Sequence, residues 1–231
     1  MPLLFWVRNG LERAMKRRVD GQRTFFDPAA FPWVATIESE WLAIRAELET
    51  VLGGGDAIPN FQDISPEQAS LTSGDMWKTY FLLGYGHRLE AHCARCPETM
   101  RLLGKIPGVR TAMFSLLAPG AHIPPHRGPY KGVLRYHLGL IVPRPEPLCR
   151  IRVGRDIRYW KEGQSLIFDD SFEHEVWNEA TGARVVLFVD IVRPLPFPLS
   201  LLNRLMIAAI SRTRFVRTAV DRARRLQVAE A

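Results

Sequence analysis

Two histidines and one arginine are the side chains of this sequence best suited to metal-centred chemistry. His126 stands in the segment 125–129 (PHRGP), His174 stands much later in the segment 168–177 (FDDSFEHEVW), and Arg184 follows after ten residues. Both histidines fall at the edges of predicted strands, and a small β-barrel could bring them to one mouth. Two imidazoles can hold Fe(II), and a guanidinium suits a dicarboxylate cosubstrate. The pattern therefore favours an iron-dependent oxygenase.

The spacing alone does not complete the usual ligand set. Non-heme iron oxygenases commonly add one carboxylate to the two imidazoles, two residues after the first histidine, and Gly128 stands there. A single histidine on a strand is more often structural than metal-binding. His122 shares the Pro- and Gly-rich segment of His126, and spacing alone does not rank one above the other.

Composition indicates a globular chain with an anionic partner. The 231 residues are 47% hydrophobic, carry a formal net charge of +7 and can form one sizeable domain with a helical appendage. The positive charge gathers at the two ends and is mixed there with apolar residues, which favours an anionic membrane surface. No nucleic-acid partner is expected, because the β-rich part lacks a platform of basic and aromatic residues.

Cysteine usage and hydropathy indicate the compartment. Three cysteines give no disulfide framework, no secretory signal is recognisable and no apolar run reaches the length of a membrane span. We expect a cytoplasmic protein that can lie on the inner face of the membrane. Cys93 and Cys96, with His87 and His92 nearby, offer a zinc alternative, but all four crowd into ten residues. Buried reduced thiols are the favoured interpretation.

The elements that must position these residues are mainly strands. From residue 110 onward the chain reads as short β-rich runs separated by Gly, Pro, Asp and Asn, which is typical of a double-sheet β architecture. The spacing predicts helices over residues 3–19 and 37–52, an irregular segment over 25–33 and an exposed loop over 56–75. The predicted domains are an N-terminal helical and irregular layer (1–74), a jelly-roll core (75–195) and a basic amphipathic helical tail (196–231).

Across about residues 75–195 the chain resembles the aspartyl/asparaginyl β-hydroxylase family, a branch of the Fe(II)/2-oxoglutarate oxygenases. The resemblance lies in the segments 126–129 (HRGP), 134–140 (LRYHLGL) and 166–177 (LIFDDSFEHEVW), and in Arg184. It implies a mainly β, double-stranded β-helix (jelly-roll, cupin-like) core with N-terminal helices. It also implies Fe(II) as the cofactor, with 2-oxoglutarate and O₂ as cosubstrates. Protein-hydroxylating members of the family lack the carboxylate ligand, so Gly128 is an expected departure from the common triad.

The resemblance also assigns roles to particular residues. His126 and His174 become the iron ligands, and Arg184 with Ser115 binds the distal carboxylate of 2-oxoglutarate. Arg135 and His137 share one side of a strand. By resemblance they face the other end of the cosubstrate or the substrate, which makes Arg135 a further catalytic candidate. Asp170 is expected to support iron-bound water from outside the ligand set.

The substrate stays open between an aspartyl or asparaginyl residue and a lipid acyl chain. In protein-hydroxylating members a basic residue two before the strand arginine grips the substrate, and Val133 stands there. The segments 96–99 (CPET), 135–137 (RYH), 192–194 (VRP) and 203–204 (NR) resemble the bacterial lipid A acyl-chain hydroxylases. That branch, however, tends to carry Asp in place of Gly128. The alternative to an enzyme is a non-catalytic jelly-roll binding or sensor module at an anionic membrane surface, and the sequence does not determine the oligomeric state.

Overall fold

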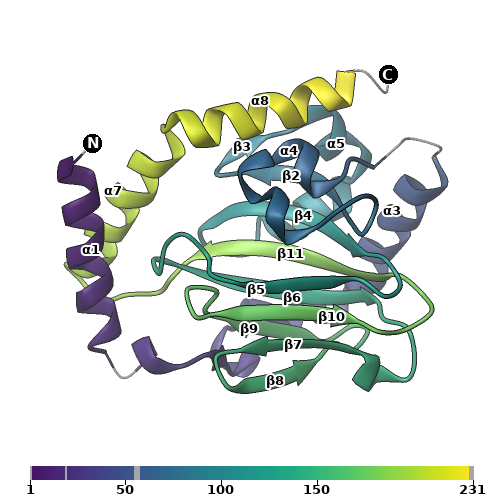
Figure 1. Ribbon diagram of the computed structural model, residues 1–231, viewed down its shortest axis with the longest axis horizontal. Helices are drawn as coiled ribbons and strands as arrows, with labels where there is room; N and C mark the ends of the chain where they lie inside the picture. The colour runs from purple at the N-terminus through teal and green to yellow at the C-terminus, as the bar shows by residue number, and fades with distance from the viewer. Residues whose placement is uncertain (1, 19, 55–57, 229–231) are drawn as a thin grey trace.

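Two antiparallel β-sheets packed face to face form the centre of the protein, with helices outside them (Figure 1). The computed structural model describes residues 2–18, 20–54 and 58–228. The larger sheet runs in the order β1 (Phe25–Phe26), β9 (Ser165–Phe168), β6 (Val133–Ile141), β11 (Arg184–Val192), β4 (Val109–Leu117), β2 (Trp77–Gly84) and β3 (His87–Arg88). The smaller sheet runs in the order β5 (His122–His126), β10 (His174–Asn178), β7 (Cys149–Val153) and β8 (Asp156–Tyr159). This arrangement confirms the predicted mainly β, jelly-roll core.

Side-chain alternation along the central strands decides which residues face the space between the sheets. In β11, Val185 and Leu187 pack against the outer helices, whereas Val186 and Phe188 pack between the sheets. Because successive side chains of a strand point to opposite faces, Arg184 belongs to the inner set.

The two strands beside β11 follow the same rule. In β6, Tyr136 and Leu138 join the outer core, so Arg135 and His137 face inward, and in β4 Ser115 faces inward as well. The pairing of the strands places Ser115 opposite Val186 and His137 opposite Phe188. The large sheet therefore presents the predicted polar residues to the small sheet.

Helices cover the outer face of the large sheet and one end of the molecule. α2 (Trp33–Ser39), α3 (Trp41–Gly53), α5 (Glu90–Arg95) and α6 (Pro97–Leu103) share one hydrophobic core with that sheet. α1 (Pro2–Lys16) packs on α7 (Leu199–Ser211), and α8 (Arg214–Val228) crosses above α4 (Phe61–Ile64) and β2 (Figure 1). Short 3₁₀ helices are η1 (Asp20–Gln22), η2 (Pro28–Ala30), η3 (Pro66–Leu71) and η4 (Glu146–Leu148). Across the described ranges, no helix combines the length and the apolar character that a membrane crossing requires.

Three sequence expectations outside the jelly roll need comment. The exposed loop predicted over 56–75 is wrong for its described part, where α4 and η3 lie. Ile64 is buried in a cluster with Ala223 of α8, whereas Phe61 and Leu71 are buried in the cluster that contains Trp77. The segment predicted to be irregular contributes β1, which pairs with β9. The predicted terminal helices are confirmed by α1, α7 and α8. Residues 1, 19, 55–57 and 229–231 of the predicted segments lie outside the described residues.

Candidate active site

The two predicted iron ligands face each other on neighbouring strands of the small sheet. His126 ends β5, His174 begins β10, and the pairing of these strands puts the two residues directly opposite each other. Their ring centroids lie 4.0 Å apart. In each ring Nδ1 is held by a backbone carbonyl, that of Pro124 at 2.8 Å for His126 and that of Phe172 at 3.0 Å for His174. A carbonyl only accepts, so Nδ1 carries the proton and Nε2 of both rings is left with its lone pair.

Burial keeps both imidazoles neutral. It lowers the pKa of His126, and it lowers the pKa of His174 to about 3, with the neighbouring His126 as the second cause. A neutral imidazole is the form that binds a metal ion. Over the described ranges, no group of three or more His, Cys, Asp or Glu side chains comes together as a metal site. The histidine pair thus stands without a third protein ligand.

Arg184 carries a buried charge, and no acidic side chain in the described part of the chain forms an ion pair with it. The residue is only 2% exposed, and neither Nε nor Nη1 has a hydrogen-bond partner there. The guanidinium lies over the Trp160 ring at 4.5 Å, and burial lowers its pKa to about 10, so it stays charged at neutral pH. An unpaired buried cation is costly, and an anionic ligand would remove that cost.

One small cavity joins these groups. Its wall includes His126, His174, Arg184, Ser115, His137 and Arg135. We call it the histidine cavity. Ser115 Oγ accepts a 2.9 Å hydrogen bond from Trp77 Nε1, which leaves the hydroxyl proton available to a ligand. Both ring nitrogens of His137 lack partners, and burial holds its pKa well below the usual range.

Arg135 is tied to two acids at the edge of this cavity. Its Nη2 lies 2.8 Å from Asp170 Oδ2, its Nε donates to Asp190 Oδ1 at 3.0 Å, and its guanidinium stacks on Phe188 at 4.2 Å. Burial raises the pKa of Asp170 to about 6 in spite of Arg135. The charge of Arg135 is therefore neutralised within the protein, unlike that of Arg184.

Gly128 leaves no room for the missing carboxylate ligand. A Cβ at this position would lie 2.0 Å from Asp170 Oδ2, and the Gly128 amide donates to the backbone carbonyl of Asp170 at 2.7 Å. The carboxyl group of Asp170 thus occupies the space beside the histidine-bearing turn where a side chain of residue 128 would begin.

The structure distinguishes His122 from His126, which spacing alone did not rank. His122 lies on the outside of the barrel, where it stacks on Trp177 and contacts Glu175 at 3.2 Å. The zinc alternative also fails to assemble: Cys93 donates to the Leu82 carbonyl and His92 bonds to that of Phe81. The thiols are buried, as expected.

Two side chains that support the site, Trp77 and Asp190, are not among the residues predicted from the sequence. Asp190 has a sequence signal, because it lies six residues after Arg184 in an otherwise apolar strand and therefore shares the inward face with Arg184. For Trp77 we see no sequence signal, since its partner Ser115 lies on a strand far along the chain.

Two packed antiparallel sheets with a histidine pair between them define a jelly-roll protein. The family model described as aspartyl/asparaginyl beta-hydroxylase matches residues 38–194, and the chain belongs to that family. Its relatives include an ornithine lipid ester-linked acyl 2-hydroxylase of Rhizobium tropici, 48% identical over 87% of this chain and 72% of that protein.

A second kind of relative acts on amino-acid residues, by its name. The human aspartyl/asparaginyl beta-hydroxylase is 37% identical over 70% of this chain, and the match spans 21% of that longer protein. Among solved structures, a cupin domain of an Enterobacter cloacae regulator is similar over 52% of this chain with 13% identity and a TM-score of 0.37. The named relatives support an enzyme that hydroxylates.

Proposed function

We propose that this protein is an Fe(II)- and 2-oxoglutarate-dependent dioxygenase that hydroxylates an unactivated C–H bond. The observation that carries the proposal is the buried guanidinium of Arg184, whose Nε and Nη1 have no hydrogen-bond partner among the described residues, in the same cavity as the histidine pair. The residues present fit both the metal ion and the cosubstrate. Two neutral imidazoles with free Nε2 atoms suit the metal ion, and a buried cation suits the distal carboxylate of the cosubstrate.

Each polar residue of the histidine cavity has a part in this proposal. His126 and His174 hold the iron, which when bound supplies the activation of O₂. Arg184 binds the distal carboxylate, and Ser115 donates its hydroxyl to the same group while Trp77 fixes the direction of that hydroxyl. His137 is neutral and close enough to line the cavity beside them. Apolar neighbours such as Phe168 exclude water, which strengthens every polar contact inside.

In the proposal, Arg135 and Asp170 position other groups of the site and do not react themselves. Asp190 and Phe188 hold Arg135, and Arg135 in turn holds Asp170 beside the turn that carries His126. In the proposal Asp170 supports the water that takes the place of a third protein ligand, and Arg135 forms the wall between the histidine cavity and the substrate side.

The substrate that fits best is a lipid acyl chain. The acyl 2-hydroxylase of R. tropici matches most of this chain, and position 133, basic in protein-hydroxylating relatives by resemblance, is Val133 in an apolar wall. An aspartyl or asparaginyl residue is the second candidate, favoured by the match to the human enzyme. By analogy with the bacterial relative, the position attacked is C2, next to the ester carbonyl.

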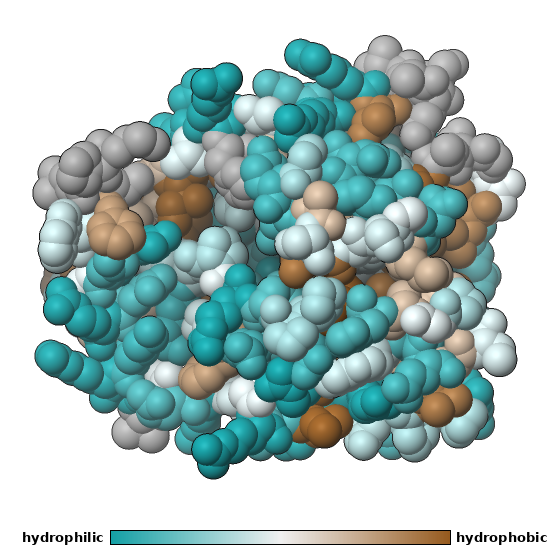
Figure 2. Space-filling view, in the orientation of Figure 1, coloured by the Kyte–Doolittle hydropathy of each residue, from teal (hydrophilic) through white to brown (hydrophobic). Residues whose placement is uncertain are grey.

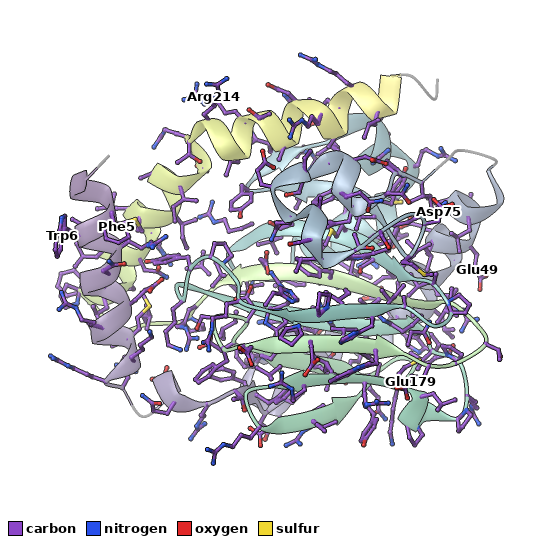
Figure 3. The ribbon with its side chains drawn as sticks, in the orientation of Figure 1. Phe5, Trp6, Glu49, Asp75, Glu179 and Arg214 are labelled. Carbon is purple, nitrogen blue, oxygen red and sulfur yellow. The ribbon has the colours of Figure 1, made fainter. Side chains whose placement is uncertain are left out.

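An anionic membrane surface is the proposed location of the substrate, on the cytoplasmic side. Trp6 is 66% exposed and points away from the protein, whereas Phe5 points toward α7 (Figure 3). Phe197 is 79% exposed, and hydrophobic residues gather among hydrophilic ones near α1 and α7 (Figure 2). Arg13 and Lys16 in the last turn of α1 add positive charge. Amphipathic helices of this kind lie in anionic interfaces.

The test measures succinate formation and product mass together. Purified protein with Fe(II), 2-oxoglutarate and O₂ is given an ornithine lipid or an asparagine-containing peptide, and mass spectrometry searches for one added oxygen. Oxygen insertion into the ester-linked chain with matching succinate supports the proposal. Insertion into the peptide would favour the second candidate. If protein that binds metal forms neither product nor succinate, the proposal is wrong and the non-catalytic binding module is favoured.

A further inference from the structure

Two apolar cavities lie on either side of one wall at the edge of the active site. The α7 cavity holds about 310 Å³ and the α8 cavity about 300 Å³, both within the range of ligand pockets. Each is named for the helix that covers it. Five residues line both cavities: Tyr85, Thr111, Pro129, Arg135 and Asp190.

The α7 cavity is walled by hydrocarbon away from this shared wall. Its apolar lining comes from three elements that meet there, α1, the segment that enters β6, and α7: Phe5, Tyr130, Val133, Met206, Ile207 and Ile210. Arg8, Arg110, Asp170 and Thr213 are its other polar members. Phe5 is half exposed, so the outer end of the cavity lies at the apolar surface of α1 and α7.

The α8 cavity is also mainly apolar, but different helices line it. Phe61 and Ile64 of α4, Phe81 of β2, and Ala219 and Val220 of α8 line it. Its polar members outside the shared wall are Ser65, Glu67, Gln68 and Arg127. α7 lines only the first cavity and α8 only the second, and these helices lie over different parts of the barrel (Figure 1), so the two cavities have different outer walls.

Arg135 lies where the α7 and α8 cavities meet the histidine cavity. It lines the α7 cavity, the α8 cavity and the histidine cavity, while Phe188 lines the last two. A molecule with two hydrocarbon arms on one polar centre matches this arrangement: each arm enters one cavity, and the polar branch point rests on the wall that contains Arg135. A carbon next to the branch point would then be the carbon nearest the histidine pair.

We propose that the α7 and α8 cavities bind the two acyl chains of one lipid molecule, with its ester group at Arg135. This inference rests on the proposed function for the reaction and goes beyond it by assigning a separate site to each chain. Position 2 of an ester-linked chain is adjacent to the carbonyl, so two-chain anchoring also explains selection of that carbon. The chain termini extend away from the reacting centre.

Blocking one cavity at a time tests the inference without iron or cosubstrate. The probes are a short-chain ornithine lipid with two eight-carbon chains and the same lipid without its ester-linked chain, and calorimetry measures their dissociation constants. Ile210→Trp fills the α7 cavity, and Ala219→Trp fills the α8 cavity. Ala208→Trp and Thr218→Trp are matched controls, because both lie on the same two helices and line neither cavity.

The expected result has a distinctive pattern. Each buried methylene strengthens binding about fourfold, so four buried methylenes of a second chain give about 200-fold. Either blocking substitution should weaken binding of the two-chain lipid to about the affinity of the one-chain lipid. Binding of the one-chain lipid should be lost in the variant whose blocked cavity takes that chain and should stay unchanged in the other variant, and the double variant should bind neither lipid.

Two outcomes would overturn the inference. Unchanged two-chain affinity in either blocked variant would remove that cavity as an acyl site, and so would equal affinity of both lipids for the unmodified protein. A folded-state check by circular dichroism accompanies each variant. Ile210→Ala, which enlarges the α7 cavity, should move the preferred chain length upward even if the tryptophan variant does not fold. Lipid-dependent succinate formation reports on the proposed function separately: it can persist if the cavities are misassigned, and it can fail while both chains bind.

Discussion

The carboxyl group of Asp170 fills the space that a side chain on residue 128 would need. A Cβ there would meet Asp170 Oδ2 at 2.0 Å, and the acid cannot easily withdraw because it is fully buried and paired with Arg135. The backbone of Gly128 does not have a positive φ, so the exclusion is steric rather than conformational. Residue 128 thus cannot supply a carboxylate ligand while Asp170 keeps its position.

Gly128→Ala should destabilise the protein by about 1–3 kcal/mol, because the added methyl displaces a buried, paired carboxylate. Asp170→Ala removes the obstacle, so the double variant should be more stable than the sum of the two single effects predicts, with a coupling of about 0.5–3 kcal/mol. Urea unfolding of all four proteins measures this cycle. Gly10→Ala is the control, since open space surrounds a Cβ there. Additive effects would show that the two residues do not compete for space.

Arg184→Met should separate stability from cosubstrate binding. Loss of an unpaired buried cation should make the ligand-free protein more stable, by about 1–3 kcal/mol, while 2-oxoglutarate should bind with about 2–5 kcal/mol less free energy. Thermal unfolding with and without 2-oxoglutarate in the presence of metal reports both effects. Arg155→Met replaces an exposed arginine and should change neither. If the variant were less stable and still gained stability from 2-oxoglutarate, Arg184 would be a structural residue.

His174→Ala should remove metal binding, because it deletes one of two protein ligands. Loss of a group that merely supports a ligand costs up to about 100-fold in affinity, and loss of the ligand itself should cost more. Electron paramagnetic resonance of Mn(II), used in place of Fe(II), counts the bound metal. His122→Ala is the matched control, since His122 lies outside the histidine cavity on the neighbouring strand. Equal loss of metal in the two variants would contradict the assignment.

Asp170 should make stability depend on pH. Its pKa is raised from 3.8 to about 6 in the folded protein, so folding favours the protonated acid. The stability that this preference contributes is complete below about pH 4 and is lost as pH rises through 6, by about 3 kcal/mol in total.

Comparison with Asp170→Asn isolates this contribution. Urea unfolding between pH 4 and pH 7 should show the unmodified protein losing stability relative to the variant as pH rises. The exposed Asp63→Asn serves as a control for general pH effects. A difference that stays constant over this range would mean that Arg135 keeps Asp170 ionised throughout.

The jelly roll could be predicted because its strands carry their own signals. Short β-rich runs and two-residue periodicity placed β4, β6, β10 and β11 and put Arg135 and His137 on one face. The resemblance named His126 over His122, which spacing alone could not do. The arrangement of the strands brings six of the seven predicted site residues to the histidine cavity, and the seventh, Asp170, pairs with Arg135 beside it.

The rest depends on contacts between distant parts of the chain. The segment 56–75 reads as an exposed loop, and the burial of Phe61 is explained by its stacking on Trp77 of β2, a contact that the segment itself does not reveal. Nothing local shows that Asp170 takes the place of a residue 128 side chain, because the two are far apart in sequence. The cavities beneath α7 and α8 likewise exist only once the terminal helices have docked.

Strand β11 carries the proposed anchor of the cosubstrate at one end, Arg184, and part of the proposed lipid wall at the other, Asp190. At about 3.3 Å per residue, the backbone between them spans about 20 Å. Because a shift of one residue turns every side chain of a strand to the opposite face, mispairing of β11 would withdraw both residues at once. A molecule with β11 mispaired would then bind neither 2-oxoglutarate nor the lipid in the proposed way.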